Sequence, residues 1–314
     1  MTLAGYLGPP GTFSHEALAR AAAGRALELV PLPTVQDAVL GVRDGELDRA
    51  LVPIENSLEG AVTATLDTLA LAAERVAILA ELVHPISQCL IAREQLALEE
   101  IEVVVSHPQP SGQCRAWLRT HVPSATLAPA SSTAEAVRVV AERGGRWAAL
   151  GNRLAAELYG CRVLAADVQD EPDNDTRFVW LGPRATSAEA AGRARAPQGG
   201  DPRCEMGEGR EQRVGLASTR FKTAIVFWGA GSEAPGWLVA CLSELSRRGV
   251  NLTRIESRPR RRGLGQYMFF ADLEGHVDEE PVAAGLAGLR SHVEVLRVLG
   301  SFPAAAGYEP VELP

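Results

Sequence analysis

Short apolar runs alternate with helical patterns along the first 183 residues, and this alternation is the strongest constraint on the fold. The predicted helices are 14–23, 34–44, 60–73, 112–121, 132–144 and 152–159, and the predicted strands are 3–7, 28–32, 49–54, 77–82, 87–92, 102–106, 125–128, 147–150, 162–166 and 177–182. Such an order favours an α/β domain with largely parallel sheets.

The segment from Arg75 to Arg93 differs from the rest of this region. It contains two apolar runs with His84-Pro85 between them, which indicates a crossover from one sheet to another. We therefore expect a two-lobed domain over residues 1–183, with a later segment that returns to the first lobe and a cleft between the lobes.

The chain changes character after residue 183. Residues 184–219 are rich in Ala, Gly, Arg, Glu and Pro without apolar periodicity, which predicts a flexible linker. Order resumes as the predicted strands 222–228, 250–257, 266–273 and 293–299 and the predicted helices 235–248 and 279–291. This βαββαβ order predicts a ferredoxin-like domain over residues 220–302, followed by a mobile tail at 303–314.

Charge and hydropathy exclude several classes of partner. The net charge of −8 argues against nucleic acid, because phosphate binding needs clustered Lys and Arg, and the one dense basic run, Arg258 to Arg262, is short. No apolar run approaches the ~20 residues of a membrane span, and the N-terminal residues lack a positive leader before an apolar core. We therefore expect a cytoplasmic protein without a membrane partner.

Cysteine and lysine usage argues against metal and cofactor chemistry. The five cysteines are scattered, with no C-x-x-C and no His at metal-ligand spacing, so we expect reduced thiols and no metal site. Lys222 is the only lysine, which disfavours Schiff-base chemistry and a Walker A loop. No G-x-G-x-x-G loop occurs either, so we expect no cofactor.

Polar loops follow five of the predicted strands, and each loop leads into a helix. In an open α/β sheet, ligands bind at the carboxyl ends of strands, where helix N-termini offer unpaired N–H groups to anions. Such loops would suit a small, multiply charged acid, although Ser, Thr and Asn at these places also serve as helix caps. Capping is the preferred role for Ser132, Thr133 and Asn152. Glu55 needs a partner or a function, because it directly follows a buried strand.

The segment Asn174-Asp175-Thr176-Arg177-Phe178 lies where a polar loop becomes the apolar strand Val179-Trp180-Leu181. Side chains alternate between the two faces of a strand, so Thr176 and Phe178 should point one way and Arg177 the other, unless loop geometry still governs this end. By itself this triplet is an ordinary strand start.

Four motifs together resemble the prephenate dehydratases in order and spacing. They are Gly8-Pro-Pro-Gly-Thr-Phe-Ser14, Val52-Pro-Ile-Glu-Asn-Ser57 with Glu59-Gly60, Ser106-His-Pro-Gln109 with Gln113-Cys114, and Asn174-Asp-Thr-Arg-Phe178. The C-terminal domain is similar to the regulatory ACT domain of that family. The resemblance implies a two-lobed catalytic domain, like that of periplasmic binding proteins, followed by the ACT domain, and a homodimer or homotetramer.

The implied activity is the conversion of prephenate to phenylpyruvate, with loss of carbon dioxide and water, in phenylalanine biosynthesis without a cofactor. Thr176 matches the family's essential threonine, which hydrogen-bonds or donates a proton to the departing hydroxyl. Arg177 matches an arginine expected to anchor a substrate carboxylate, and Phe178 would shape the pocket. Glu55 is the alternative acid. Further matches to cleft residues of the family are Asn56, Ser106, Gln113, Thr12 and Ser14.

The resemblance also implies feedback inhibition by L-phenylalanine at the ACT domain. The matching segments are Gly236-Trp237-Leu238-Val239, Asn251-Leu252 and Glu256-Ser257-Arg258-Pro259. Trp237 departs from the alanine usual at its position, and its ring could narrow the pocket or face outward. Three alternatives stay open: an arogenate dehydratase, a non-catalytic bilobed module that binds small acids, and an ACT domain that serves dimerisation alone.

Overall fold

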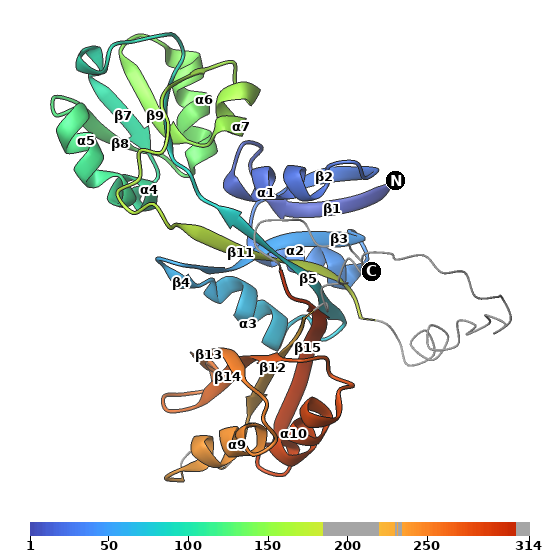
Figure 1. The fold of residues 1–314 in the computed structure, drawn as a ribbon. Coiled ribbons are helices and arrows are strands. Elements are labelled where there is room, and N and C mark those ends of the chain that lie inside the picture. The colour runs from blue at the N-terminus through green and yellow to red at the C-terminus, as the bar shows by residue number, and fades with distance from the viewer. Residues whose placement is uncertain (185–219, 230, 232–233, 306–314) are drawn as a thin grey trace, which may run out of the picture.

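The computed structural model describes residues 1–184, 220–229, 231 and 234–305, and these form three sheets with their helices (Figure 1). Most of the predicted linker and all but the first residues of the predicted tail lie outside the described residues. None of the described helices is long and apolar enough to cross a membrane.

The first lobe is built on a mixed sheet in the order β2-β1-β3-β11-β5, with β4 paired to β3. Its strands are β1 (Thr2–Leu7), β2 (Leu27–Leu32), β3 (Arg49–Asn56), β4 (Gly60–Ala61), β5 (Val76–Pro85) and β11 (Asp175–Pro183). Its helices are α1 (Phe13–Ala21), α2 (Val35–Asp44) and α3 (Thr63–Leu71).

The second lobe has a five-stranded sheet in the order β10-β6-β9-β7-β8. Its strands are β6 (Cys89–Ala92), β7 (Val103–Ser106), β8 (Thr126–Pro129), β9 (Trp147–Gly151) and β10 (Arg162–Ala165). Its helices are the short 3-10 helix η1 (Leu98–Glu100), α4 (Pro108–Gln113), α5 (Arg115–His121), α6 (Thr133–Arg143) and α7 (Arg153–Leu158).

The crossover expected near His84 is confirmed, because β5 belongs to the first sheet and β6 to the second. Strand β11 then returns from the second lobe and inserts between β3 and β5 (Figure 1). The expectation of largely parallel sheets is wrong. Strand β11 re-enters the first sheet from the opposite end, so it runs antiparallel to both β3 and β5.

The C-terminal unit is an antiparallel sheet in the order β13-β14-β12-β15, which confirms the ferredoxin-like prediction. Its elements are β12 (Phe221–Trp228), α9 (Trp237–Ser246), β13 (Leu252–Pro259), β14 (Tyr267–Glu274), α10 (Glu280–Arg290) and β15 (Val295–Pro303). Apolar residues of α9 and α10 cover one face of this sheet.

The other face of the C-terminal sheet packs on the first lobe. Val226, Phe270 and Phe302 share one buried cluster with Val52 and Ile78 of the first sheet. Strand β15 comes so close to β5 that a side chain at Gly300 would collide with the carbonyl oxygen of Ile78. The two units therefore share a hydrophobic core, and removing one would expose apolar surface of the other.

Candidate active site

A cavity of about 290 Å³ lies between the two lobes, near the lower end of the ~300–1,000 Å³ range of small-ligand sites. Residues of both lobes and of the connecting strands contribute to it. Its lining comprises Leu7, Thr12, Phe13, Ser14, Pro53, Asn56, Val62, Ile86, Gln88, His107, Gln109, Pro110, Gln113, Ser131, Ser132, Thr133, Asn174, Thr176 and Phe178.

Strand β11 divides its first residues between two faces. Thr176 and Phe178 line the cavity, whereas Arg177 does not. Thr176 pairs with Asn56 of β3, and Arg177 pairs with Glu55, so both pairs follow the alternation expected of strands. The sequence-based expectation that Thr176 and Phe178 share one face is therefore confirmed.

The Thr176 hydroxyl is held in a defined orientation by Asn56. The carboxamide oxygen of Asn56 accepts the backbone N–H groups of Leu58 and Glu59 at 3.0 and 2.9 Å, so its nitrogen must face β11. This nitrogen donates to Thr176 Oγ1 at 2.9 Å. Because the hydroxyl oxygen is thus an acceptor, and it donates to no group among the described residues, its own proton is available to the cavity.

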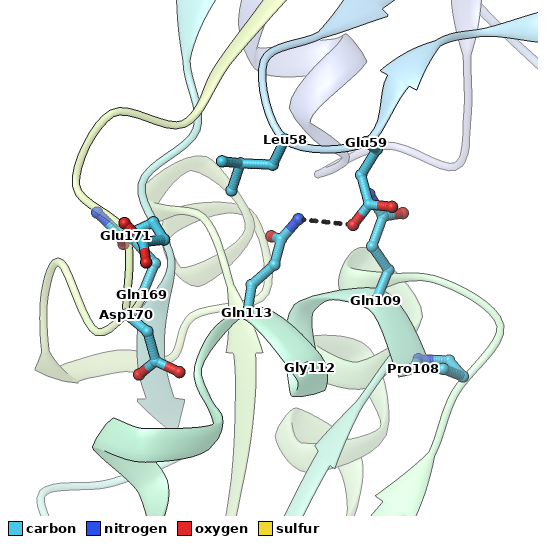
Figure 2. A pocket seen from close by; sticks show the side chains of 9 residues that line it. All are labelled: Leu58, Glu59, Pro108, Gln109, Gly112, Gln113, Gln169, Asp170 and Glu171. Carbon is cyan, nitrogen blue, oxygen red and sulfur yellow. Dashed lines mark hydrogen bonds between the residues drawn. The ribbon is translucent and has the colours of Figure 1, made fainter.

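A chain of side-chain amides continues from Asn56 across the cleft. Asn56 donates to Asn174 Oδ1 at 2.8 Å, and Asn174 donates to Gln113 Oε1 at 3.2 Å. Gln113, at the end of α4 in the second lobe, donates in turn to Glu59 of the first lobe at 3.3 Å (Figure 2). Gln113 also borders a neighbouring cavity of about 610 Å³, which Glu59, Asp170 and Glu171 make acidic.

Two helices direct their N-termini at the cavity, one from each lobe. Thr12 caps α1 by accepting the N–H of His15 at 3.3 Å, and Ser132 caps α6 by accepting the N–H of Glu135 at 3.0 Å. The first turns of both helices line the cavity. Their remaining unpaired N–H groups and their helix dipoles favour negative charge at these two places.

No Asp, Glu, Lys or Arg lines the cavity within the described chain, and His107 is its single ionisable residue. With no carboxylate in its lining, the cavity brings no like charge into direct contact with a dianion, while hydroxyls, amides and backbone N–H groups supply hydrogen bonds. In the described ranges, no group of three or more His, Cys, Asp or Glu side chains could hold a metal ion.

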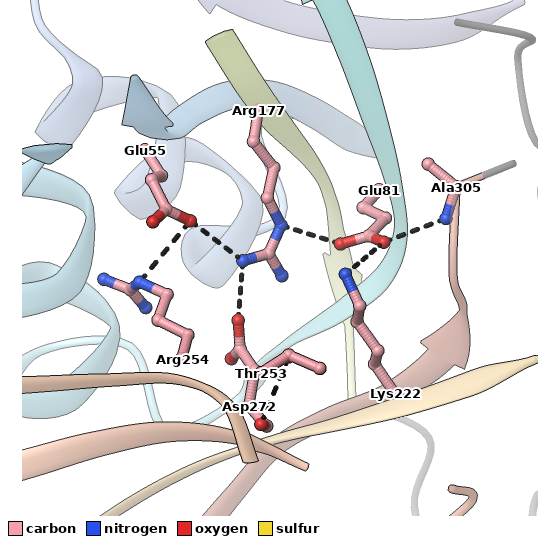
Figure 3. A network of polar contacts seen from close by, with 8 residues as sticks. All are labelled: Glu55, Glu81, Arg177, Lys222, Thr253, Arg254, Asp272 and Ala305. Atoms are coloured by element: carbon pink, nitrogen blue, oxygen red, sulfur yellow. Dashed lines mark hydrogen bonds and ion pairs between the residues drawn. The ribbon is translucent and has the colours of Figure 1, made fainter. Parts of the chain in front are cut away.

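Arg177 and Glu55 belong to a separate charged cluster on the opposite face of β11 (Figure 3). The Arg177 guanidinium contacts Glu81 at 2.7 Å, Asp272 at 2.6 Å and Glu55 at 3.3 Å. Burial opposes its charge, but Asp272 and Glu81 outweigh burial and raise the pKa of Arg177. Glu55 faces Arg177 and Arg254. These two cations are the partners that a carboxylate directly after a buried strand requires.

Comparison with known proteins decides the family. The family model described as prephenate dehydratase matches residues 4–186. The chain belongs to the prephenate dehydratase family. The prephenate dehydratase of Mycobacterium tuberculosis strain H37Rv is 38% identical over 315 residues, which cover 97% of this chain and 88% of that protein.

Two solved structures resemble nearly the whole chain. One is a prephenate dehydratase from Arthrobacter aurescens in complex with L-Phe, with 34% identity and a TM-score of 0.78 over 100% of this chain and 93% of that one. The other, GqqA, is described as a novel type of quorum quenching acylase, with 27% identity and a TM-score of 0.76 over 97% and 98% of the two chains.

The remaining motif residues have mixed positions. Thr12, Ser14 and Gln113 line the cavity together with Asn56, as expected of cleft residues in this family. The Ser106 hydroxyl donates to the carbonyl of His107 at 3.0 Å and does not line the cavity. Ser132 and Asn152 cap α6 and α7, as predicted, but the capping prediction for Thr133 is wrong, because Thr133 is the first residue of α6. Ser132 and Thr133 also line the cavity.

Gln88 and Asn174 are cavity residues that were not among the predicted site residues. Gln88 is only 1% exposed, and its buried side-chain oxygen has no hydrogen-bond partner among the described residues. A buried amide without a partner is costly, which makes Gln88 a candidate contact for a bound molecule. One glutamine between two apolar runs carries no sequence signal, whereas Asn174 opens the family's fourth motif and could have been included.

The segments predicted to bind phenylalanine lie on α9 and on the edge strand β13. Trp237 neither faces outward nor stands free, because its indole N–H donates to the His292 carbonyl at 2.7 Å and its ring packs near Phe227 and Phe269. Arg258 forms an ion pair with Asp67 of α3 in the first lobe at 3.1 Å.

Proposed function

We propose that this chain converts prephenate to phenylpyruvate, carbon dioxide and water in the cavity lined by Thr176, as its family membership implies. The Thr176 hydroxyl carries this proposal: it lies in the cavity, accepts a hydrogen bond from Asn56 and keeps its own proton available. In the reaction, the bond to the ring carboxylate breaks and its electron pair enters the ring. The bond to the ring hydroxyl breaks at the same time, and the departing hydroxide takes up a proton, which solvent ultimately supplies, and leaves as water.

Protonation or hydrogen bonding of the departing hydroxide is general acid catalysis, and Thr176 supplies it in this proposal. Glu55 is the weaker candidate, because it lies on the opposite face of the sheet and is paired with Arg177 and Arg254. An alcohol is a poor acid by itself, so Thr176 acts chiefly by donating a hydrogen bond that strengthens as negative charge develops on the leaving oxygen.

The two carboxylates of prephenate are proposed to bind at the N-termini of α1 and α6. Both helix starts line the cavity from opposite lobes, and both helices are long enough to present a dipole there. Gln88 is proposed to hydrogen-bond the substrate as well. An anchoring role for Arg177 stays a prediction, and its side chain is engaged by three carboxylates away from the cavity.

Thr176→Ala tests the activity. We expect turnover of prephenate, followed by the ultraviolet absorbance of phenylpyruvate, to fall by about 10²–10⁴-fold, the usual range of general acid catalysis, while circular dichroism stays unchanged. Thr68→Ala is the matched control, because Thr68 is similarly buried but bonds to the Ala64 carbonyl within α3. Near-normal turnover by Thr176→Ala, or a large preference of the wild type for arogenate, would overturn the proposal.

L-Phenylalanine is proposed as the allosteric inhibitor, bound by the segments Gly236–Val239, Asn251–Leu252 and Glu256–Pro259. The relative from Arthrobacter aurescens, solved in complex with L-Phe, supports this proposal. Titration of phenylalanine into the prephenate assay tests it, and Glu256→Gln is expected to raise the concentration needed for half-inhibition. An unchanged rate at saturating phenylalanine would leave the C-terminal unit with a structural role.

The protein is further proposed to act as a cytoplasmic homodimer or homotetramer. The edge strand β13 leaves Ile255 46% exposed, which suits pairing with a second copy. The four described cysteines are free thiols, as expected in a reducing compartment. Light scattering on the purified protein measures the oligomeric state, and a monomer at micromolar concentration contradicts this part of the proposal.

A further inference from the structure

The Arg177 cluster joins the two units of the chain by buried charges. Arg177 of β11 contacts Asp272 of β14 at 2.6 Å, and Glu81 of β5 contacts Lys222 of β12 at 2.9 Å (Figure 3). Glu81 also accepts the backbone N–H of Ala305 at 2.8 Å. Each of these three contacts links the first lobe to the C-terminal unit.

The cluster is balanced in charge, and its two central carboxylates are almost closed to solvent. Its three carboxylates, from Glu55, Glu81 and Asp272, face three cations, from Arg177, Lys222 and Arg254. The side chains of Glu81 and Asp272 are only 2% and 3% exposed. Removal of one charge therefore leaves an opposite charge buried without compensation.

Asp272 has no other role within the described chain. Its carboxylate forms hydrogen bonds and ion pairs with Arg177 alone, whereas Glu81 is shared by Arg177, Lys222 and Ala305. A buried carboxylate on the C-terminal sheet is thus dedicated to one side chain of the strand that carries Thr176.

The backbone of β11 is paired unevenly at Arg177. The ladder to β3 shifts register between Arg177 and Phe178, whereas the ladder to β5 runs without a shift from Asp175 to Trp180. On the β3 side, backbone hydrogen bonds therefore hold this part of the strand less firmly. The Arg177 side chain, fixed at two of its nitrogens by Glu81 and Asp272, adds a restraint at this point of the strand.

We propose that Asp272 is a positioning residue for the dehydratase reaction: through Arg177 it fixes the segment of β11 that presents Thr176 to the cavity. The C-terminal unit thereby contributes directly to the geometry of the catalytic hydroxyl. This inference rests on the proposed role of Thr176. If Thr176 is the catalytic hydroxyl, its position must be fixed closely, because a misplacement of about 1 Å can cost ~10²-fold in rate.

The test compares Asp272→Asn with Asp67→Asn in the full-length protein, without phenylalanine. Asp67 is a matched control, because it is 7% exposed and pairs with Arg258 and Arg261 of the same C-terminal unit, and its carboxylate has no ion pair with β11 within the described chain. Arg177→Lys is a second variant that keeps the charge balance, although a lysine cannot bridge Glu81 and Asp272 as a guanidinium does.

We expect Asp272→Asn and Arg177→Lys to lower kcat at least about tenfold with KM within about threefold, because chemistry and not binding is impaired. Amide hydrogen exchange over residues 175–183 should become faster in both variants, whereas Asp67→Asn should change neither kcat nor this exchange. The proposal is overturned if Asp272→Asn and Arg177→Lys keep kcat within about twofold of the wild type, or if Asp67→Asn lowers kcat as much.

Turnover of prephenate by the wild-type protein shows whether a negative result concerns the role of Asp272 or the proposed function itself. Absence of phenylpyruvate formation by the wild type would refute the function alone. The hydrogen-exchange comparison would still decide whether Asp272 restrains β11, because it needs no substrate.

Discussion

The Arg177 guanidinium lies 2.6 Å from the Asp272 carboxylate, so the strand that carries Thr176 is ion-paired to the C-terminal sheet. Thr176 and Arg177 are neighbours in sequence but face opposite sides of β11. One face of this strand therefore lines the cavity, while the other face holds the two units together. Arg177, which contacts the C-terminal unit, is therefore joined by one peptide bond to Thr176, which lines the cavity.

The buried carboxylate of Glu81 predicts a specific dependence of stability on pH. Burial tends to raise its pKa, but the charges of Arg177 and Lys222 outweigh burial and hold the pKa of Glu81 below its ordinary value of 4.5. A carboxyl whose pKa is lower in the folded state than in the unfolded state contributes its full stabilisation at pH values above the unfolded-state pKa. This stabilisation is lost as the pH falls through the folded-state pKa. The free energy of unfolding should therefore fall on acidification below about pH 4.5.

Glu81→Gln should lower the free energy of unfolding by ~3 kcal/mol at neutral pH, because it leaves the largely buried Arg177 and the partly buried Lys222 under-compensated. The difference from the wild type should shrink as the pH falls, which urea unfolding between neutral and acidic pH measures. Glu135→Gln is the control, since Glu135 pairs with Arg138 at a more exposed site. A constant difference at all pH values would contradict this account of Glu81.

Gln88→Met separates substrate binding from stability. The wild-type side-chain oxygen has no partner among the described residues, so replacement of the amide by an apolar side chain of similar size should leave the melting temperature unchanged or raise it. KM for prephenate should rise about tenfold, which corresponds to the loss of one hydrogen bond of ~1.4 kcal/mol between the Gln88 amide and the substrate.

Gln169→Met is the contrasting variant for Gln88. Its amide oxygen accepts the backbone N–H of Gln88 at 2.9 Å, so its loss should lower the melting temperature with KM unchanged. If Gln88→Met behaves in the same way, Gln88 is a structural residue and does not contact the substrate.

Asn56→Asp should reverse the hydrogen bond at the Thr176 hydroxyl. The new carboxylate can only accept, so the hydroxyl would donate its proton to position 56 and no longer to the leaving group. The added charge also repels a dianion. We expect kcat to fall by about 10²-fold or more, measured by phenylpyruvate formation.

Asn152→Asp is the control for this substitution. Asn152 caps α7 by accepting the N–H of Ala155 at 2.8 Å and does not line the cavity. Aspartate caps helices as well as asparagine does, so this variant should keep its kcat, while burial of the new charge should lower its melting temperature. Equal losses of activity in the two variants would argue against a specific role of the Asn56–Thr176 hydrogen bond.

Trp237→Ala restores the alanine that is usual in the family, and we expect it to destabilise the protein. The indole ring packs near Phe227 and Phe269, and its N–H donates to the His292 carbonyl. Loss of the ring should cost ~3 kcal/mol, the lower end of the range for such truncations, because Trp237 is only partly buried. Thermal unfolding measures this effect.

The same position tests how the ring relates to regulation. Because the ring is packed within the C-terminal unit, the phenylalanine concentration for half-inhibition should stay within about threefold in Trp237→Phe, which keeps an aromatic ring there. A gain of sensitivity in both variants would show that the wild-type ring obstructs the binding pocket.

Local sequence patterns determined much of this protein. Caps such as Thr12, Ser132 and Asn152 were predictable because hydroxyl and amide side chains before a helix satisfy its free N–H groups. The alternation of side chains along a strand was enough to place Arg177 on the face opposite Thr176 and Phe178. The order of four motifs identified the family, and the βαββαβ pattern predicted the C-terminal fold.

Only the tertiary structure decided which partners these side chains have. Arg177 and Asp272 are 95 residues apart in sequence, and their contact exists because the C-terminal sheet packs on the first lobe. The antiparallel insertion of β11 likewise depends on a return from the second lobe, and Gln88 becomes a cavity residue because the crossover lies beside that strand. Periodicity specifies which side chains share a face, whereas long-range packing specifies what that face meets.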